Sequence, residues 1–244
     1  MSNIDSNDLQ KLYIAYFGRP GDPSGINYWL SRSNESLTLR SISNELSRQD
    51  EYKEHISCNR SFDFKINQLY LNLFNRKVDF KGLNYWMEMV TRHEYKISDI
   101  VYELVSSSKK PYSVTPDQEK SDITILQNKT LVAELFTKQI SKSITLINLY
   151  KPDSISPWVS GNSFIRVSNF LNHINYQTAS IKEVDQLIFS LSDTSINLLT
   201  SPAIEIQDLS LSIPIYQLKD RSLTKRFANK LINITGGVLD QSRN

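Results

Sequence analysis

The sequence of 244 residues is poor in features on which several classes of protein depend. Cys58 is its only cysteine, so neither an internal disulfide nor a thiolate metal site can form within the chain. No run approaches the roughly 18–20 consecutive apolar residues that a membrane-spanning helix needs. The first ten residues, MSNIDSNDLQ, contain neither the basic nor the apolar region of an N-terminal secretory signal peptide. We therefore expect no membrane span, and either a cytoplasmic location or export without such a signal.

An excess of charge of one sign and the common catalytic motifs are also lacking. The chain has 28 lysine and arginine residues and 26 acidic residues, so its charge is nearly balanced. Proteins that bind nucleic acid or lipid phosphate need a concentrated positive charge, which this composition does not indicate. His55, His93 and His173 show no metal-binding spacing, and no phosphate loop, dinucleotide fingerprint, nucleophile elbow, C-x-x-C or EF-hand pattern occurs. These absences favour a protein that is not an enzyme and has no nucleic-acid partner.

What the chain does contain is one stretch that occurs twice. Residues 12–30 read LYIAYFGRPGDPSGINYWL and residues 69–87 read LYLNLFNRKVDFKGLNYWM, at a constant offset of 57 residues. Such self-similarity predicts a duplicated supersecondary unit. The residues that define the repeat are Arg19, Asp22, Gly25, Tyr28 and Trp29 in the first copy, and Arg76, Asp79, Gly82, Tyr85 and Trp86 in the second.

The local pattern predicts two helices in each copy, joined by a turn that holds the arginine. Apolar residues at i, i+3, i+4, i+7 and i+8 precede both turns, which is one stripe of an amphipathic helix. Asp22 and Asp79 lie where a helix N-cap would lie. Gly25 and Gly82 fall in the first helical turn, where glycine costs stability, so we expect a backbone or an aromatic ring close by. The stripes are Leu9, Leu12, Tyr13, Tyr16 and Phe17, and Ile66, Leu69, Tyr70, Leu73 and Phe74.

The aromatic and charged members of the motif have two interpretations. The Tyr-Trp pairs could stack on sugar rings, but a tryptophan on an apolar helical stripe is more often core, and we favour core for Trp29 and Trp86. We interpret the arginine and aspartate of each copy as a pair that fixes the loop rather than as catalytic groups.

The R-x2-D-x2-G-x-x-Y-W pattern after an L-Y-x3-F helix resembles a bacterial repeat domain of unknown function. That domain occurs in secreted RTX-type and surface-layer (S-layer) proteins of Gram-negative bacteria, and more distantly resembles the helical linker domains of phycobilisomes. In the family a third helix closes on a small-x-E-aromatic signature, which residues 46–52 match well and residues 104–112 match loosely. The resemblance covers about residues 8–112, and residues 125–137 (ILQNKTLVAELFT) would extend it to about 140.

These observations predict an all-α fold, a helical bundle or array. Two tandem three-helix repeats, about 8–57 and 62–112, occupy residues 1–112. A C-terminal helical part, 113–244, is expected to pack on the repeats and to end in a linker-like tail. It holds helical patterns over 119–150 and 164–174, a loop at 151–162 and a helix opened by the capping box of Ser180 and Glu183. A short extended arm near 203–218 and a last helix through Leu223–Leu231 complete the prediction.

The resemblance implies the N-terminal lipopolysaccharide-binding anchor domain of an S-layer protein. The partner would be the O-polysaccharide, with calcium as a candidate cofactor, type I secretion to the cell surface and self-association in an array. The candidate carbohydrate contacts, chosen for expected exposure, are Trp158, Asn162, Arg166, Tyr16 and Arg19. The alternatives are an intracellular helical scaffold for protein assembly, and a glycan-modifying enzyme, which would need two carboxylates at glycosidase separation in one cleft.

Overall fold

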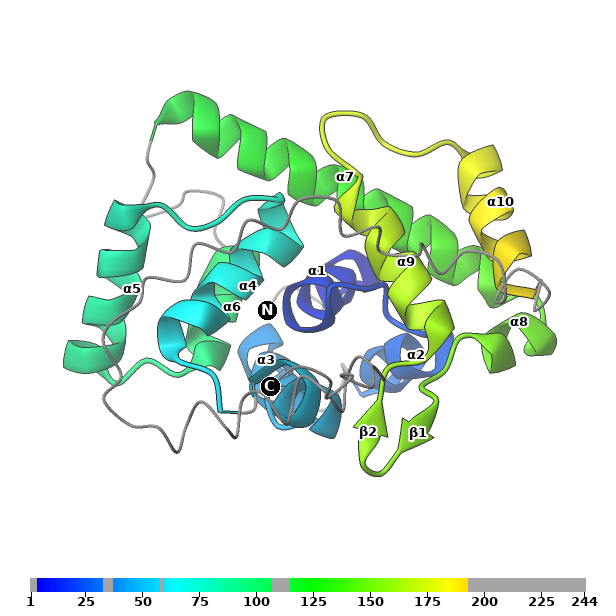
Figure 1. Ribbon diagram of the computed structural model, residues 1–244, viewed down its shortest axis with the longest axis horizontal. Coiled ribbons are helices and arrows are strands. Elements are labelled where there is room, and N and C mark those ends of the chain that lie inside the picture. Colours follow the sequence, from blue (N-terminus) through cyan, green and yellow to red (C-terminus); the bar gives the residue numbers. More distant parts are fainter. Residues whose placement is uncertain (1–3, 33–36, 58, 107–114, 193–244) are drawn as a thin grey trace, which may run out of the picture. The chain divides into compact units, whose positions relative to one another are not determined.

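The computed structural model describes residues 4–32, 37–57, 59–106 and 115–192 (Figure 1). These residues are mostly helical, so the predicted all-α class is confirmed. None of the described helices is both long and apolar enough to cross a membrane. The predicted arm at 203–218 and the last helix lie outside the described residues. The elements are α1 (Ser6–Phe17), α2 (Pro23–Ser31), α3 (Leu39–Leu46), the π-helical segment η1 (Glu51–Ser57), α4 (Phe62–Phe74), α5 (Phe80–His93), α6 (Ile97–Ser106), α7 (Pro116–Ile140), α8 (Ile144–Leu149), β1 (Ser154–Ile155), β2 (Trp158–Val159), α9 (Asn162–Asn172) and α10 (Ile181–Ser192).

The two copies of the sequence repeat form α1–α2–α3 and α4–α5–α6. In each copy the first helix contacts the other two, and between the copies α1 contacts α4 and α3 contacts α6. α7 lies across both first helices, α1 and α4. The later helices α8, α9 and α10 each contact α7, so α7 joins these three helices to the repeats.

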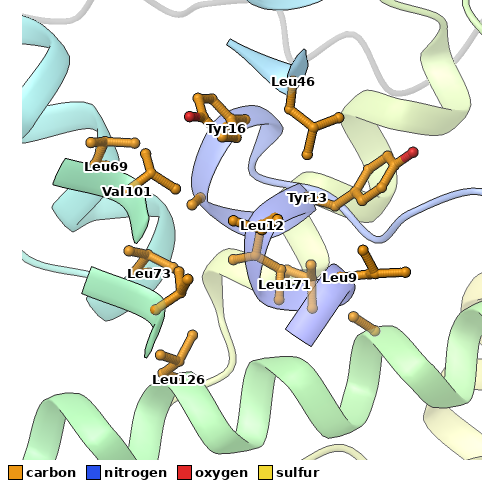
Figure 2. Packing of buried hydrophobic residues seen from close by; sticks show 14 of the residues in the cluster. Leu9, Leu12, Tyr13, Tyr16, Leu46, Leu69, Leu73, Val101, Leu126 and Leu171 are labelled. Atoms are coloured by element: carbon orange, nitrogen blue, oxygen red, sulfur yellow. The ribbon is translucent and has the colours of Figure 1, made fainter. Parts of the chain in front are cut away.

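Helix α1 lies at the centre of the core. Its apolar stripe meets side chains from α3, α4, α6, α7 and α9 (Figure 2). Because helices surround it on several sides, α1 is buried over most of its circumference, and even Ile14 and Ala15 are inaccessible. The labelled side chains of this cluster are Leu9, Leu12, Tyr13, Tyr16, Leu46, Leu69, Leu73, Val101, Leu126 and Leu171.

The turn after each first helix has the same geometry in both copies. α1 ends at Gly18 with φ of 65° and α4 ends at Asn75 with φ of 56°, a left-handed conformation that glycine and asparagine tolerate best. The predicted N-caps are confirmed: Asp22 accepts from the Gly25 amide at 2.8 Å, and Asp79 from the Gly82 amide at 2.9 Å.

The two repeat glycines differ in what lies beside them. A Cβ on Gly25 would stand 2.2 Å from the hydroxyl oxygen of the buried Tyr13, so the expected aromatic neighbour is confirmed there. At Gly82 the nearest atom is Cγ2 of Val78 at 3.0 Å, and the Tyr70 hydroxyl is in ordinary contact at 3.6 Å. The second copy therefore leaves more room for a methyl group.

We expect Gly25→Ala to destabilise the protein by about 1–3 kcal/mol, because the new methyl group overlaps a ring that the core holds in place. Gly82→Ala should change stability by less than about 1 kcal/mol, since a small overlap is offset by the higher helix propensity of alanine. Urea unfolding monitored by circular dichroism measures both. Equal losses of unfolding free energy in Gly25→Ala and Gly82→Ala would contradict the inference that Gly25 is the more tightly packed of the two.

Two details of the C-terminal part differ from the sequence prediction. The apolar face predicted within residues 119–150 consists of Ile123, Leu126, Leu131, Leu135 and Phe136, but Leu131 is 51% exposed. The predicted loop at 151–162 contains a small antiparallel hairpin, in which Ser154 pairs with Val159 and Ile155 with Trp158. The capping box is confirmed, since Glu183 accepts from the Ser180 amide at 2.7 Å and the Ser180 hydroxyl accepts from the Glu183 amide at 3.3 Å.

Candidate functional site

A cleft with a volume of about 990 Å³ is called the hairpin cleft below. Its walls come from α1, the first repeat turn, α2, α3, the start of η1 and the β1–β2 hairpin. In Figure 1 the hairpin stands beside α2 and close to α3. Segments distant in the sequence thus meet here, and the first repeat supplies most of the lining.

Trp158, predicted to be the most accessible tryptophan, lies in this cleft on β2. Its amide donates to Oε2 of Glu54 in η1 at 2.9 Å, and its indole stacks on Phe164 with the ring centroids 6.3 Å apart and an interplanar angle of 23°. The backbone of Trp158 is therefore bound to η1, and its half-buried ring packs against α9.

Tyr28 provides a second aromatic surface in the hairpin cleft. Its ring is 50% exposed and packs edge-on against Trp29, with centroids 4.9 Å apart. Arg32, one helical turn later, donates to the Tyr28 hydroxyl. Trp29 is only 6% exposed and Trp86 is fully buried, so the prediction that both indoles belong to the core is confirmed. Of each Tyr-Trp pair, the tyrosine is the more exposed residue.

Polar groups of several kinds line the same cleft. They include four carboxylates, two serine hydroxyls, one carboxamide and the guanidinium groups of Arg19 and Arg32. Such a mixture can both accept from and donate to the hydroxyl groups of a polar ligand. The polar residues other than the arginines are Asp22, Glu45, Asp50, Glu51, Ser24, Ser41 and Gln49.

Arg19 closes the inner wall of the hairpin cleft and is only 5% exposed. Its Nε and Nη2 donate to the two carboxylate oxygens of Glu51 at 2.8 and 2.7 Å, and its Nη1 donates to the carbonyl of Pro20 at 3.0 Å. Its guanidinium also lies 3.9 Å from the centroid of the Phe164 ring. Burial by itself would lower the pKa of Arg19, but the charge of Glu51 raises it above its usual value. Arg19 is therefore a fixed structural cation.

The second repeat builds the same arrangement with a different acid. Nε and Nη2 of Arg76 donate to Asp122 of α7 at 2.9 and 2.7 Å, and Nη1 donates to the carbonyl of Lys77 at 3.1 Å. The residue that corresponds to Glu51 in the second copy, 57 positions later, is Ser108, and an uncharged serine cannot form an ion pair with Arg76. In the second repeat the carboxylate therefore comes from α7, beyond the end of the repeat.

The expected arginine–aspartate pairing within each turn needs correction. In the first copy Asp22 caps α2 and Arg19 pairs with Glu51, so the prediction is wrong. In the second copy Arg76 and Asp79 do approach, at 3.7 Å, but the closer and bidentate partner is Asp122. Each arginine fixes its turn to a distant segment, because a buried guanidinium needs a carboxylate that binds it with both oxygens.

The five candidate carbohydrate contacts, chosen for expected exposure, lie in different environments in the structure. Tyr16 is completely buried and bonded to the hydroxyl of Ser43 at 2.8 Å, and Arg19 is buried, so the expectation of exposure is wrong for both. Asn162 is exposed and Arg166 half-buried on α9, but neither lines the clefts described here. Arg166 donates to the carbonyl of Ser190 at 2.7 Å, which ties α9 to α10. Trp158 and Arg19 both line the hairpin cleft, but only Trp158 is more than slightly exposed there.

A second cleft, of about 280 Å³, shares three lining residues with the first and is called the α4–α9 cleft below. The shared residues are Phe17, Arg19 and Glu51. The rest of its lining comes from α4, from α9, and from Gly18, Arg60 and Ser160 in the segments between helices. The buried Arg19–Glu51 pair thus borders two separate hollows.

The described part of the chain holds no group of three or more histidine, cysteine or acidic side chains that could bind a metal ion. The carboxylates of the hairpin cleft do not form such a group. No described side-chain cluster therefore serves as a ready calcium site.

Residues 42–109 match the model of a family described as "Domain of unknown function (DUF4214)". The match begins within α3 and covers η1 and the second repeat through α6. Neither a curated protein nor a solved structure matches the chain. The matched segment is thus similar to a family whose description assigns no function.

Proposed function

We propose that this chain is a non-catalytic, cell-surface anchoring domain of an S-layer-like secreted protein, and that it binds the O-polysaccharide of lipopolysaccharide. The observation that carries the proposal is the hairpin cleft of about 990 Å³, in which Tyr28 and Trp158 lie beside hydroxyl, carboxamide and carboxylate groups. The proposal also draws on the resemblance of the sequence repeat to domains of secreted surface proteins.

The chemistry of the hairpin cleft suits a polar and largely uncharged polymer. Tyrosine and tryptophan offer flat apolar faces with a polar edge, which match the apolar faces and hydroxyl rim of a pyranose ring. The net formal charge of +2 on the whole chain gives no concentrated field for an acidic polymer. Ordering costs are small, because Trp158 is already held by Glu54 and Phe164.

A passive role fits the way three of the four carboxylates of the cleft are used. Glu51 gives both carboxylate oxygens to Arg19, and Asp22 caps α2 through the Gly25 amide. Glu45 is paired with Arg48 on the surface. Carboxylates that hold structure in this way are poor general acids or bases, which need freedom to exchange a proton near neutral pH.

Anchoring does not require tight binding by one copy. In a two-dimensional array, many weak contacts act together, and the effective concentration of neighbouring sites turns modest affinity into firm attachment. We therefore propose self-association of the secreted protein at the cell surface, with calcium tested as a cofactor of the assembly.

The intracellular scaffold is the alternative, and an exposed apolar patch on one repeat would favour it. Within the described part of the repeats, the large hydrophobic residues that stand exposed are Tyr28, Phe64 and Phe80, each on a different helix. Isolated residues of this kind are normal on protein surfaces. Cell fractionation separates the hypotheses, since a protein confined to washed cytosol would contradict the anchor.

The experiment for the anchor is a pull-down with lipopolysaccharide that has or lacks its O-polysaccharide, with and without calcium. We expect recovery only with the O-polysaccharide, and a loss of affinity of about tenfold in Trp158→Ala and in Tyr28→Ala, as for truncation of an aromatic contact worth about 1–2 kcal/mol. Tyr176→Ala is the matched control, because Tyr176 is 68% exposed and lines neither cleft. Equal recovery from both forms of lipopolysaccharide would contradict the proposal.

A further inference from the structure

The α4–α9 cleft differs in chemistry from the hairpin cleft, although both border the Arg19–Glu51 pair. Carboxamide groups face it from two helices, Gln68 from α4 and Asn169 and Asn172 from α9. The exposed side chains of Asn169 and Asn172 have no hydrogen-bond partner among the described residues. They are therefore available to a ligand as both donors and acceptors.

Charge also distinguishes the two clefts. Among the described residues that line the α4–α9 cleft, Glu51 is the only acidic one, and Arg19 neutralises its charge. The remaining charged group in its lining is Arg60, whose guanidinium lies 4.8 Å from the centroid of the Phe64 ring. Arg60 makes no ion pair with any described residue, so the described lining of this cleft has a net charge of one positive unit.

The position of Arg60 over Phe64 prepares it for an anion. Stacking on an aromatic face restricts the guanidinium while leaving its N–H groups free. A planar guanidinium binds carboxylate or phosphate oxygens through two parallel hydrogen bonds. Phe64 is 39% exposed, which leaves apolar surface at the same rim.

Size limits the ligand further. A volume of about 280 Å³ is near the lower end of ligand pockets, which run from roughly 300 to 1,000 Å³. The cleft is therefore suited to a single ring rather than to a stretch of polymer.

We propose that the α4–α9 cleft binds one sugar ring that carries an anionic substituent, either a carboxylate or a phosphate ester. Arg60 pairs with the anion, and the carboxamides of Asn169 and Asn172 bond to the ring hydroxyls. This site is separate from the polysaccharide contact in the hairpin cleft, whose lining is rich in carboxylates and would repel the same ligand.

The test is a titration of the ¹⁵N-labelled protein, followed by NMR, with three probes: methyl glucuronide, methyl glucoside 6-phosphate and methyl glucoside. We expect saturable shifts of the Asn169 and Asn172 side-chain amides, with at least one anionic probe binding about tenfold tighter than the neutral one, as for one added charge-assisted bond. The carboxylate and phosphate arms show which anion the cleft prefers.

Arg60→Gln should reduce the affinity for the anionic probe to that of the neutral glycoside. Asn169→Asp adds a negative charge without changing the shape of the side chain, and it should also lower the affinity for the anionic probe. Arg92→Gln is the matched control, because Arg92 is an exposed arginine on α5 that lines neither cleft. Equal affinity for all three probes, or equal losses in Arg60→Gln and Arg92→Gln, would overturn the proposal.

The two proposals fail separately. Tyr28→Ala should leave binding of the anionic monosaccharide unchanged, because Tyr28 does not line the α4–α9 cleft. Loss of monosaccharide binding in Tyr28→Ala would overturn the separate site, whereas the hairpin cleft is tested by comparing lipopolysaccharide recovery in Tyr28→Ala with that in the control Tyr176→Ala.

Discussion

Glu51→Gln is expected to lower the free energy of unfolding by about 3–5 kcal/mol, the cost of removing one partner from a buried ion pair. Glu51 accepts two hydrogen bonds from Arg19, whose side chain is 6% exposed while that of Glu51 is 12% exposed. A neutral glutamine would leave the guanidinium charged, since nothing near neutral pH deprotonates arginine. The uncompensated charge would then remain among the aromatic rings that enclose it, which is the origin of the cost.

Urea unfolding at pH 7 measures this loss, and two variants calibrate it. Glu45→Gln removes the acid of an exposed pair with Arg48, whose side chains are 50% and 58% exposed, and should cost less than about 1 kcal/mol. Asp122→Asn removes the corresponding acid of the second repeat, and its cost should lie between the other two because Arg76 is 21% exposed. Similar values for Glu51→Gln and Glu45→Gln would show that the Arg19 pair does not hold the first repeat together.

Those features that depend on neighbours in sequence were predictable. The apolar stripes indicated α1 and α4, and the aspartates before Gly25 and Gly82 indicated the N-caps, because helix periodicity and capping are determined within one or two turns. The inward position of both tryptophans followed from the apolar faces of the second helices, α2 and α5. The 57-residue offset then predicted that the two halves would have the same order of helices.

The partners of the motif arginines were not predictable from local spacing. Asp22 is three residues from Arg19, but its carboxylate is drawn to the unpaired amide groups of the α2 N-terminus. Glu51 reaches Arg19 only because η1 folds back against α1. The one signal in the sequence was the glutamate in the third-helix signature at residues 46–52, together with its replacement by Ser108 in the second copy.

The candidate site was predicted only in part, for two reasons. The hairpin at 154–159 has two-residue strands, too short for a period-2 pattern, so the loop that carries Trp158 showed no sign of its structure. Tyr16 was proposed as a sugar contact although it lies on the stripe that buries α1. In that case the periodicity was the better guide, since a residue on the core face of a central helix has no access to solvent.

Lys129 is the residue that the sequence pattern hid most completely. It occupies the core face of α7 between Leu126 and Ala133, at positions that a helix brings together, and it is fully buried. Its Nζ donates to the backbone carbonyl of Asn72 in α4 at 2.5 Å. Lysine is almost never fully buried without a charged partner, so its residue type indicates an exposed side chain. Its position on the helix indicates a buried one.

Lys129→Met is expected to stabilise the protein by about 2–3 kcal/mol at pH 7.5, an effect that depends on pH. Burial lowers the pKa of Lys129 from 10.5 to about 7, so the unfolded chain binds a proton at this group that the folded protein largely lacks. Between these two values the stability of the wild type therefore rises with pH, by about 1.4 kcal/mol per pH unit relative to the variant. The lost hydrogen bond to Asn72 costs the variant about 1 kcal/mol, so its advantage should fall to near zero at about pH 9.5.

Urea unfolding of both proteins at intervals from pH 7 to pH 9.5 measures this difference, and comparison at equal pH cancels the tyrosine residues that titrate at higher pH. Lys138→Met is the control, because Lys138 is exposed on the same helix and its replacement should leave both stability and its pH dependence within about 0.5 kcal/mol of the wild type. A constant difference between Lys129→Met and the wild type over this range would mean that Lys129 keeps its proton inside the fold. The charge would then have to be balanced within the core, and the contact between α4 and α7 would be held by an ion rather than by a neutral amine.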